Sequence, residues 1–234
     1  TFNPVAPNNG VLGIAVDPLT SKIYIGGWFT NYAGSGGNRI ARLNTDGSRD
    51  ATFSVGTGFD GDVNRVQYDL VTNKIYLSGD FEFYNGVGSY SGLIRLNLDG
   101  SADSAFFPAL HRFNSNSGAF TIASTNTVWS FCSWCRNSAN YTINVASFDV
   151  ITGAPVAPWS LQNNIDEEVL DMYLGPADSY AVLMGGFEGI GEWSNLSYRS
   201  QEFLKVDINR VPFPEFKPGY ATDFYMGWRG RIAV

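Results

Sequence analysis

The sequence of 234 residues predicts an all-β fold built from four similar units, and three observations support this prediction. Similar segments recur along the chain at intervals of 52 or 53 residues. Runs rich in β-branched and aromatic residues alternate with Asp-Pro, Gly-Gly and Asp-Gly pairs, which is typical of short strands joined by tight turns. No segment places its apolar residues at the spacing of a helix. Recurrence at a fixed interval indicates a repeat protein.

The clearest recurrence is a strand that ends in glycine and an aromatic residue. Lys22–Phe29 (KIYIGGWF) aligns with Lys74–Phe81 (KIYLSGDF). The same aromatic position falls on Trp134 in the third unit and on Phe187 in the fourth. We expect these four aromatic side chains to lie at equivalent places in the fold.

A second strand follows in every unit, and a further aromatic residue comes after it. The strands are Ile40–Asn44, Leu93–Asn97, Val145–Asp149 and Phe203–Asp207. The aromatic residues are Phe53, Phe106, Trp159 and Phe216, and Phe2 fits the same position one unit earlier.

Each unit of 52 to 58 residues has room for four short strands, beginning in the first unit with Val11–Val16, Ile23–Ile25 and Ile40–Leu43. Four strands in about 50 residues is typical of a β-propeller blade. We therefore predict a single β-propeller segment over residues 1–234, with four full blades. The predicted parts are the tail of a preceding blade at 1–10, blades at 11–62, 63–115, 116–168 and 169–224, and the first strand of a further blade at 225–234.

The first two units are similar to a known repeat. KIYIGGWFTNYAG with NRIARLNTDGSRDATF, and KIYLSGDFEFYNG with LIRLNLDGSADSAF, resemble the delta-60 repeat, a bacterial β-propeller repeat. The resemblance is close over about residues 1–106 and weak over 107–234. It implies a propeller in a bacterial surface or secreted protein or in a phage virion protein. It implies no catalytic residues, so it assigns no residue a role.

The ends of the chain do not form a complete blade. Arg231–Val234 resembles Gly13–Val16, so joining it to the N-terminal tail gives a blade without its two middle strands. The simpler expectation is a segment of a larger polypeptide or assembly. The alternative is a five-bladed ring with one degenerate blade.

Charge and composition exclude two classes of partner. The chain has 15 Lys and Arg against 22 Asp and Glu, which gives a net charge of −7. Nucleic acid is not expected, because phosphate binding depends on clustered basic residues. Membrane insertion is not expected either, because the longest uncharged stretch is rich in Ser, Asn and Thr.

Two loops alternate oxygen-bearing residues in a way that allows two interpretations. Asn44–Asp50 and Asn97–Asp103 resemble a calcium loop, but their order differs and no closing Glu follows. Asp-Gly between two strands is also a common hairpin turn. Because units 3 and 4 lose most of these oxygens, we favour hairpin turns and expect no metal and no cofactor.

Cys132 and Cys135 form the only C-x-x-C pair, and His111 is the only histidine. Zinc is therefore not expected, because a structural site needs four ligands. The alternatives are two buried or half-buried thiols, or a local disulfide. A disulfide requires a turn that starts at Trp134, because residues i and i+3 of an extended strand lie too far apart.

No set of residues predicts catalysis. Carboxylates occur in pairs at Asp60/Asp62, Asp80/Glu82 and Glu167/Glu168, but no pattern indicates that two of them face each other across a substrate. No nucleophile elbow accompanies the single histidine.

The best candidate contact residues are two tryptophans. The position before the repeated aromatic varies as Trp28, Asp80, Ser133 and Gly186, so it does not belong to the common framework. Trp193 lies in the loop that is lengthened in unit 4. Either indole suits stacking on a sugar or on a protein surface, and the alternative is packing between blades.

We therefore expect a non-enzymatic display or binding module of a larger extracellular or virion-surface protein, with a protein or glycan as its partner. The loops 114–118, 136–140 and 188–200 depart most from the repeat and should carry much of the contact surface. The alternatives are a propeller hydrolase or lyase acting on polysaccharide through Asp80 and Glu82, and an intracellular interaction scaffold.

Overall fold

The computed structural model describes most of the first half of the chain and selected strands of the second. The described residues are 1–36, 38–88, 90, 92–107, 119–123, 126–136, 142–162, 169–175, 180–185, 189–190, 198–199 and 203–207. The chain divides into two compact units, namely Thr1–Pro108 with Ile151–Gly153, and Ala109–Val150 with Ala154–Val234. We call the four sequence units repeats 1 to 4, so the first compact unit contains repeats 1 and 2.

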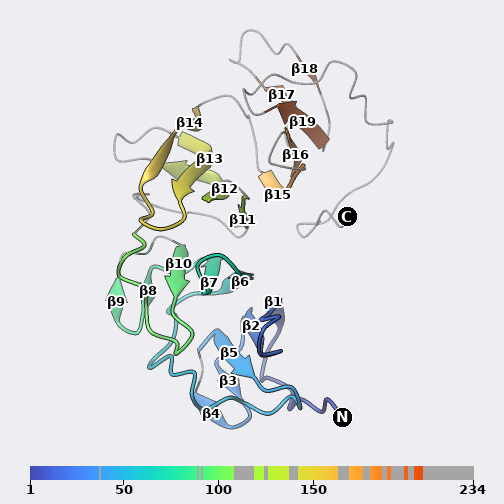
Figure 1. The fold of residues 1–234 in the computed structure, drawn as a ribbon, viewed down its shortest axis with the longest axis vertical. Coiled ribbons are helices and arrows are strands. Elements are labelled where there is room, and N and C mark those ends of the chain that lie inside the picture. The colour runs from blue at the N-terminus through green and yellow to red at the C-terminus, as the bar shows by residue number, and fades with distance from the viewer. Residues whose placement is uncertain are drawn as a thin grey trace. The chain divides into compact units, whose positions relative to one another are not determined.

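Every element within the described part of the chain is a β-strand, which confirms the predicted all-β class (Figure 1). Repeat 1 forms an antiparallel sheet of order β1-β2-β5 and a small hairpin β3–β4, and repeat 2 forms a sheet of order β10-β7-β6 and a hairpin β8–β9. The bounds are β1 Val11–Val16, β2 Ile23–Gly27, β3 Asn31–Tyr32, β4 Ser35–Gly36, β5 Ile40–Leu43, β6 Val63–Asp69, β7 Lys74–Gly79, β8 Phe83–Tyr84, β9 Val87–Gly88 and β10 Leu93–Leu96.

The second compact unit has the same kind of sheets. Repeat 3 forms a four-stranded sheet β11-β12-β13-β14, and repeat 4 forms a sheet β15-β16-β19 with a hairpin β17–β18. The bounds are β11 Ala119–Ile122, β12 Thr127–Arg136, β13 Thr142–Asp149, β14 Pro155–Gln162, β15 Val169–Leu174, β16 Tyr180–Gly185, β17 Gly189–Ile190, β18 Tyr198–Arg199 and β19 Phe203–Asp207.

The fourth strand of a blade is a full strand only in repeat 3, among the residues that the structure describes. In repeats 1 and 2 it shrinks to a single bridge, between Leu43 and Arg49 and between Leu96 and Ala102. The reason is local. Asp50 Oδ1 accepts hydrogen bonds from the Thr52 N–H and hydroxyl at 3.0 and 2.6 Å, which turns the chain out of the sheet directly after the bridge.

The strand register shows that the repeats share one backbone structure. The first strand of repeats 1, 2 and 4 carries a bulge at the same place, after the pairs Val11↔Gly27, Val63↔Gly79 and Val169↔Gly185. A bulge inserts an extra residue and bends the strand, so its recurrence at one position reflects a common design. The turn before the second strand also recurs, with a left-handed residue at φ 57°, 54° and 58° in Ser21, Asn73 and Asn126.

Glycine is required at the end of the second strand. A Cβ on Gly27 would lie 2.2 Å from the Gly10 carbonyl oxygen, and a Cβ on Gly79 would lie 1.9 Å from that of Asp62. Repeat 3 places Cys132 at this position. There β11 pairs with β12 without the bulge, and β12 continues to Arg136.

The replacement Gly79→Ala should therefore destabilise the protein by about 1–3 kcal/mol, because the added methyl group overlaps backbone that cannot rotate away. The matched control is Gly10→Ala, whose Cβ would lie 3.2 Å from the mobile Trp28 ring, and its cost should stay below about 1 kcal/mol. Denaturant titration of both variants measures the difference. Equal losses would contradict the backbone clash.

The repeated aromatic residues form the cores of repeats 1 and 2. Phe29 and Phe81 are buried, as predicted, and so are Phe53 and Phe106. In the second unit the buried side chains include Phe120, Val128, Trp129 and Phe148. The side chains of Trp134 and Trp159, and all of Phe187 and Phe216, lie outside the described residues.

A buried ion network recurs beside these aromatic residues. Arg42 Nε donates to Asp50 at 2.9 Å, and its guanidinium lies 5.2 Å from the centre of the Phe53 ring. Arg95 Nε donates to Asp103 at 2.9 Å and lies 4.8 Å from the Phe106 ring. Burial opposes ionisation of Asp50, but hydrogen bonds from Thr52 and a lysine and the charge of Arg42 hold the pKa of this carboxyl far below its ordinary value.

Successive repeats are joined by equivalent backbone bonds. The Asn3 N–H donates to the Asp46 carbonyl at 2.8 Å, and the Ser54 N–H donates to the Asp99 carbonyl at 2.7 Å. The Phe107 N–H donates to the Thr152 carbonyl at 3.2 Å in the same way. The tail of each repeat therefore binds the outer turn of the next one, which explains why residues 151–153 cluster with the first compact unit.

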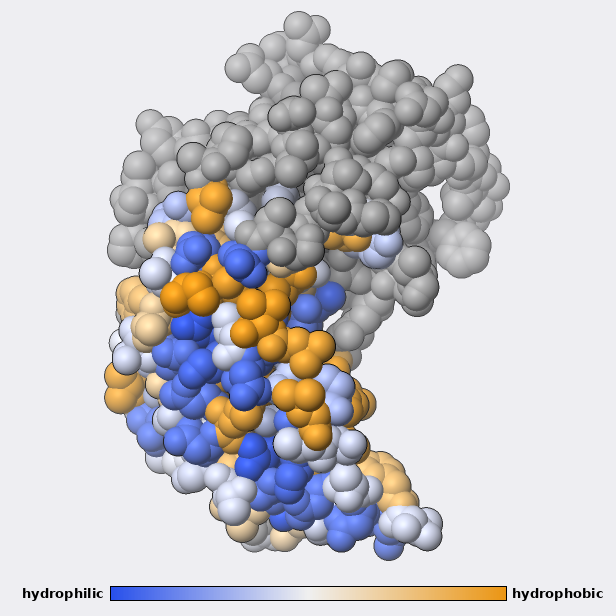
Figure 2. All heavy atoms as spheres, viewed as in Figure 1, coloured by the Kyte–Doolittle hydropathy of each residue, from blue (hydrophilic) through white to orange (hydrophobic). Residues whose placement is uncertain are grey.

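The surface of the first unit carries a band of apolar residues among hydrophilic ones (Figure 2). Several large apolar side chains are more than half exposed, namely Phe2, Val5, Ile14, Val16, Leu19, Leu70, Val71, Val87, Phe107 and Ile151. Phe2 differs from expectation, because its equivalent Phe53 is buried.

Candidate functional site

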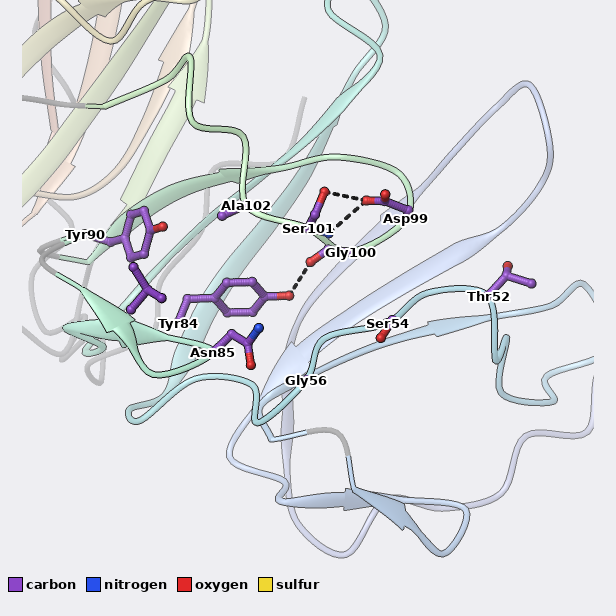
Figure 3. Close-up of a pocket in the computed structure, with 11 residues that line it drawn as sticks. Thr52, Ser54, Gly56, Tyr84, Asn85, Tyr90, Asp99, Gly100, Ser101 and Ala102 are labelled. Carbon is purple, nitrogen blue, oxygen red and sulfur yellow. Dashed lines mark hydrogen bonds between the residues drawn. The ribbon is translucent and has the colours of Figure 1, made fainter.

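A cleft of about 510 Å³ lies between the tail of repeat 1 and the outer part of repeat 2 (Figure 3). Clefts of this volume are typical of small-molecule sites. Residues from three segments line it, from the tail at 52–56, the β8–β9 hairpin with the residues after it, and the outer turn at 99–102. They are Thr52, Ser54, Gly56, Tyr84, Asn85, Val87, Tyr90, Asp99, Gly100, Ser101 and Ala102.

One side of the cleft belongs to the repeated framework. The Tyr84 hydroxyl donates to the Gly100 carbonyl at 2.5 Å, and Asp99 Oδ1 accepts from the Ser101 N–H and hydroxyl at 2.9 and 2.7 Å. Gly100 has φ 94°, and a Cβ there would lie 2.5 Å from the Ser54 carbonyl oxygen. Contact between the two backbones therefore holds this side of the cleft in place.

Repeat 1 has the same framework bonds. The Tyr32 hydroxyl donates to the Gly47 carbonyl at 2.8 Å, and Asp46 Oδ1 accepts from the Ser48 N–H and hydroxyl at 2.9 and 2.6 Å. These bonds are consequently structural, and they do not distinguish repeat 2.

The other side of the cleft is particular to repeat 2. Asn85 stands where repeat 1 has Ala33, and Val87 stands where it has Ser35. Repeat 2 also has one residue more before its third strand, and Tyr90 lies in this longer segment. Residues that differ on an otherwise constant framework are the ones expected to carry function.

Each of these residues is held in place. Asn85 has φ 51°, and its Oδ1 accepts from the Thr57 N–H at 3.1 Å, which ties the hairpin to the tail of repeat 1. Tyr90 is half-buried, and its ring lies 6.4 Å from that of Phe107. Val87 is exposed.

The cleft carries a single negative charge. Hydrogen bonds from the Ser101 side chain and backbone lower the pKa of Asp99, so this carboxyl is ionised at neutral pH. Burial raises the pKa of both Tyr84 and Tyr90, so both phenols stay neutral. The cleft therefore offers a carboxylate, an amide, hydroxyls and an aromatic ring, which suit a ligand rich in hydroxyl groups or one that carries a positive charge.

Trp28 lies at a different place in the same compact unit, directly after β2. Its N–H donates to the Gly10 carbonyl at 2.8 Å, and its carbonyl accepts from Arg39 Nη1 at 2.7 Å. The indole is half-buried against Gly10. Trp28 is thus not a lining residue of the cleft, and its role as a contact residue stays a prediction.

A polar cluster surrounds the end of the second strand. Arg39 Nη1 forms an ion pair with Asp62 Oδ1 at 2.5 Å. Burial raises the pKa of Asp80 to about 6, against a hydrogen bond with Asn64 that lowers it, and the charge of Asp62 adds to the increase. The expected partner of Asp80 was Glu82, whereas Asp62 is the carboxylate that affects it.

Other predicted site residues fall partly or wholly outside the described residues. Trp193 does so, and the loops 114–118, 136–140 and 188–200 do so almost entirely. Cys132 and Cys135 both lie on β12, which has an irregular register between Phe131 and Cys135 and does not end at Trp134. Their side chains are not described, so the choice between thiols and a disulfide stays open.

Metal-binding and membrane-spanning features were also compared with the described part of the chain. It contains no group of three or more His, Cys, Asp or Glu residues that is arranged to hold a metal ion. Asp46 and Asp99, which the calcium interpretation would use, bind Ser48 and Ser101 instead. No helix there has the length and hydropathy needed to cross a membrane.

Sequence reasoning missed the cleft residues Asn85, Val87, Tyr90 and Asp99. The test that singled out Trp28 would have found three of them, because Asn85, Val87 and Tyr90 also differ from repeat 1 within segments that otherwise align. Asp99 gave no such signal, since Asp46 occupies its position in repeat 1.

Comparisons with known proteins support the fold. Residues 21–53 and 72–106 match the family described as a domain of unknown function (DUF5122) beta-propeller. These two segments hold β2 to β5 and β7 to β10, which are the framework of repeats 1 and 2. No curated protein shows a significant match to the sequence.

Solved structures of similar fold include several propellers. Hydrazine synthase from Kuenenia stuttgartiensis has a TM-score of 0.55 and 11% identity, over 87% of this chain and 53% of that one. The WD40 β-propeller domain of Doa1 has a TM-score of 0.54 and 11% identity, over 88% and 53%. A chain of the nidogen–laminin complex has a TM-score of 0.49 and 12% identity, over 84% and 72%.

This chain spans about half the length of the hydrazine synthase and Doa1 chains. At such identities the likeness concerns the fold and not the activity. The small antiparallel sheets, the family match and these structures together show that the chain has a β-propeller fold, which is typical of interaction and structural modules.

Proposed function

We propose that this chain is a non-enzymatic binding module that takes a glycan in the cleft between the tail of repeat 1 and the β8–β9 hairpin. The observation that carries the proposal is the contrast between the two sides of the cleft. Its framework recurs in repeat 1, whereas Asn85, Val87 and Tyr90 do not. A structural role would account for the framework alone.

The chemistry of the cleft favours a sugar. The C–H face of a sugar ring packs well against an aromatic side chain, and Tyr90 offers one. Asp99 uses Oδ1 in the described hydrogen bonds with Ser101, so Oδ2 is available to a sugar hydroxyl. A carboxylate accepts strong hydrogen bonds from hydroxyl donors. The net charge of −7 makes a neutral glycan a better ligand than an acidic one.

The wider setting belongs to the same proposal. We assign the chain to the delta-60 repeats, because the family match at residues 21–53 and 72–106 falls on the segments that carry that resemblance. The module then belongs to a larger extracellular, cell-surface or virion-surface protein, in which the propeller presents its cleft to the surroundings.

A glycan array tests the proposal. The full chain should bind a subset of neutral oligosaccharides, and Tyr90→Ala and Asp99→Asn should each weaken that binding by about tenfold or more, which corresponds to about 1.4 kcal/mol. The matched control is Asp46→Asn, which breaks the same Asp–Ser turn in repeat 1 but lies away from the cleft. No binding by the full chain, or equal loss in Asp46→Asn, would contradict the assigned site.

An enzymatic alternative has one observation in its favour. Asp80 has a pKa of about 6 and lies near the ionised Asp62, and glycosidases pair a protonated carboxyl with an ionised one. However, the carboxylate of Asp62 is paired with Arg39, and neither aspartate lines the cleft. Release of reducing ends from polysaccharide, abolished by Asp80→Asn, would support the alternative and overturn the non-enzymatic proposal.

A further inference from the structure

The interface between repeats 1 and 2 is a fit of valines into a glycine notch. The strand β6 lies against β1 and β2. A Cβ on Gly26 would lie 2.4 Å from Val63 Cγ1 and 2.7 Å from Val66 Cγ2, and a Cβ on Gly13 would lie 2.8 Å from the Val66 backbone nitrogen. Repeat 1 thus presents two glycines where repeat 2 inserts two valines.

Repeat 1 has its own copy of the inserted residues. The strand register makes Val11 equivalent to Val63, because each pairs with the glycine that ends the second strand. It makes Ile14 equivalent to Val66, because they pair with Ile25 and Leu77.

Their exposure is opposite to that of their equivalents. Val66 is 5% exposed and Ile14 is 62% exposed, while Val16, two residues further along the same side of β1, is 53% exposed. The tail shows the same contrast, since Phe53 is 2% exposed and Phe2 is 51% exposed. We call Phe2, Val11, Ile14 and Val16 the β1 face. It contributes to the apolar band in Figure 2.

We propose that the β1 face docks a further propeller repeat that has glycine, or another residue as small, at the positions of Gly13 and Gly26. Such a repeat would receive Val11 and Ile14 as repeat 1 receives Val63 and Val66. Its aromatic residue at the position of Tyr24 would cover Phe2, as Tyr24 covers Phe53 edge-on with ring centres 5.5 Å apart.

One polar contact would complete this interface. Arg42 donates to the Leu98 carbonyl of the next repeat, and Arg95 donates to the Ile151 carbonyl at 2.8 Å. The equivalent carbonyl of repeat 1 is that of Thr45. An arginine at the position of Arg42 in the docked repeat would therefore donate to Thr45, which favours a repeat of this family over an unrelated apolar partner.

The glycine requirement narrows the choice of repeat. At the two notch positions repeat 2 has Arg65 and Ser78, and repeat 4 has Asp171 and Met184. Repeat 3 has Ala119 paired with Phe131. Among the four repeats, repeat 1 alone has glycine at both positions, so the occupant must resemble repeat 1.

A tandem duplication tests this inference on the full chain. A second copy of residues 2–52 is inserted after Thr52, so that Phe2 of the original copy follows in the place of Phe53. Ile14→Cys is introduced in the original copy only. Labelling of that cysteine by a maleimide is followed by mass spectrometry on the peptide that contains residue 14, so Cys132 and Cys135 do not contribute.

Labelling should be at least about tenfold slower in the duplicated chain than in the single chain, because the inserted repeat covers residue 14 and must open before reagent reaches it. The matched control is a duplicated chain with Gly26→Val in the inserted copy. Other repeats accept larger residues at this position, so the inserted copy should fold, but its notch is filled and fast labelling should return.

Four results would overturn the inference. Unchanged labelling in the duplicated chain would do so, and so would an inserted copy that hydrogen exchange shows to be unfolded. Slow labelling that the single chain already shows at every concentration would mean that one of its own four repeats covers the face. Slow labelling of the single chain at high concentration only would identify a second copy as the occupant.

Discussion

Truncation of Phe53 to alanine should lower the free energy of unfolding by about 3–5 kcal/mol, the usual cost of removing a buried phenylalanine. Phe53 is 2% exposed, and its ring packs edge-on against Tyr24 and beneath the guanidinium of Arg42. Its loss leaves a cavity where repeats 1 and 2 meet. A urea titration of the full chain measures the loss.

The repeat supplies a matched control for this variant. Phe2 occupies the same position one unit earlier but is 51% exposed, so Phe2→Ala should cost less than about 0.5 kcal/mol. The two variants remove the same atoms from the same position of the repeat and differ only in burial. A loss below about 1 kcal/mol for Phe53→Ala, or similar losses for both variants, would refute the assigned packing.

Replacement of Arg95 by methionine should also cost about 3–5 kcal/mol, because it leaves a buried carboxylate without its partner. The side chains of Arg95 and Asp103 are 3% and 12% exposed, and Arg95 Nη2 lies 2.9 Å from Asp103 Oδ2. The variant also loses hydrogen bonds to the Tyr76 hydroxyl at 3.1 Å and to the Ile151 carbonyl at 2.8 Å. Urea titration at neutral pH measures the effect.

Two further variants separate the buried charge from the lost contacts. Asp103→Asn added to Arg95→Met should recover part of the stability, because a neutral amide costs less to bury than a charge. Arg39→Met removes an ion pair whose side chains are 23% and 32% exposed, and its cost should stay below about 1 kcal/mol. If Arg39→Met costs as much as Arg95→Met, burial does not determine the strength of these pairs.

Many features of the fold follow from short-range rules that the sequence displays directly. Alternating apolar residues and Asp-Gly or Asn-Gly turns identified the strands of repeats 1 and 2, because side-chain direction and turn conformation are set by neighbouring residues. The recurrence of Phe29 as Phe81 and of Phe53 as Phe106 predicted which aromatic residues would be buried. The fourth strand was overestimated, because Asp50 and Thr52 turn the chain away after one bridge.

The candidate site and the β1 face depended on tertiary structure. The cleft joins residues 52–56 to residues 84–102, and only the packing of repeat 1 on repeat 2 brings these segments together. Trp28 was identified from its variation between repeats, yet its half-buried place against Gly10 depends on a backbone approach that no periodicity reveals. The sequence by itself determined which positions are equivalent among the repeats. Burial at those positions was decided by the tertiary structure, since Ile14 and Val66 occupy the same position and only Val66 has a neighbouring repeat packed over it.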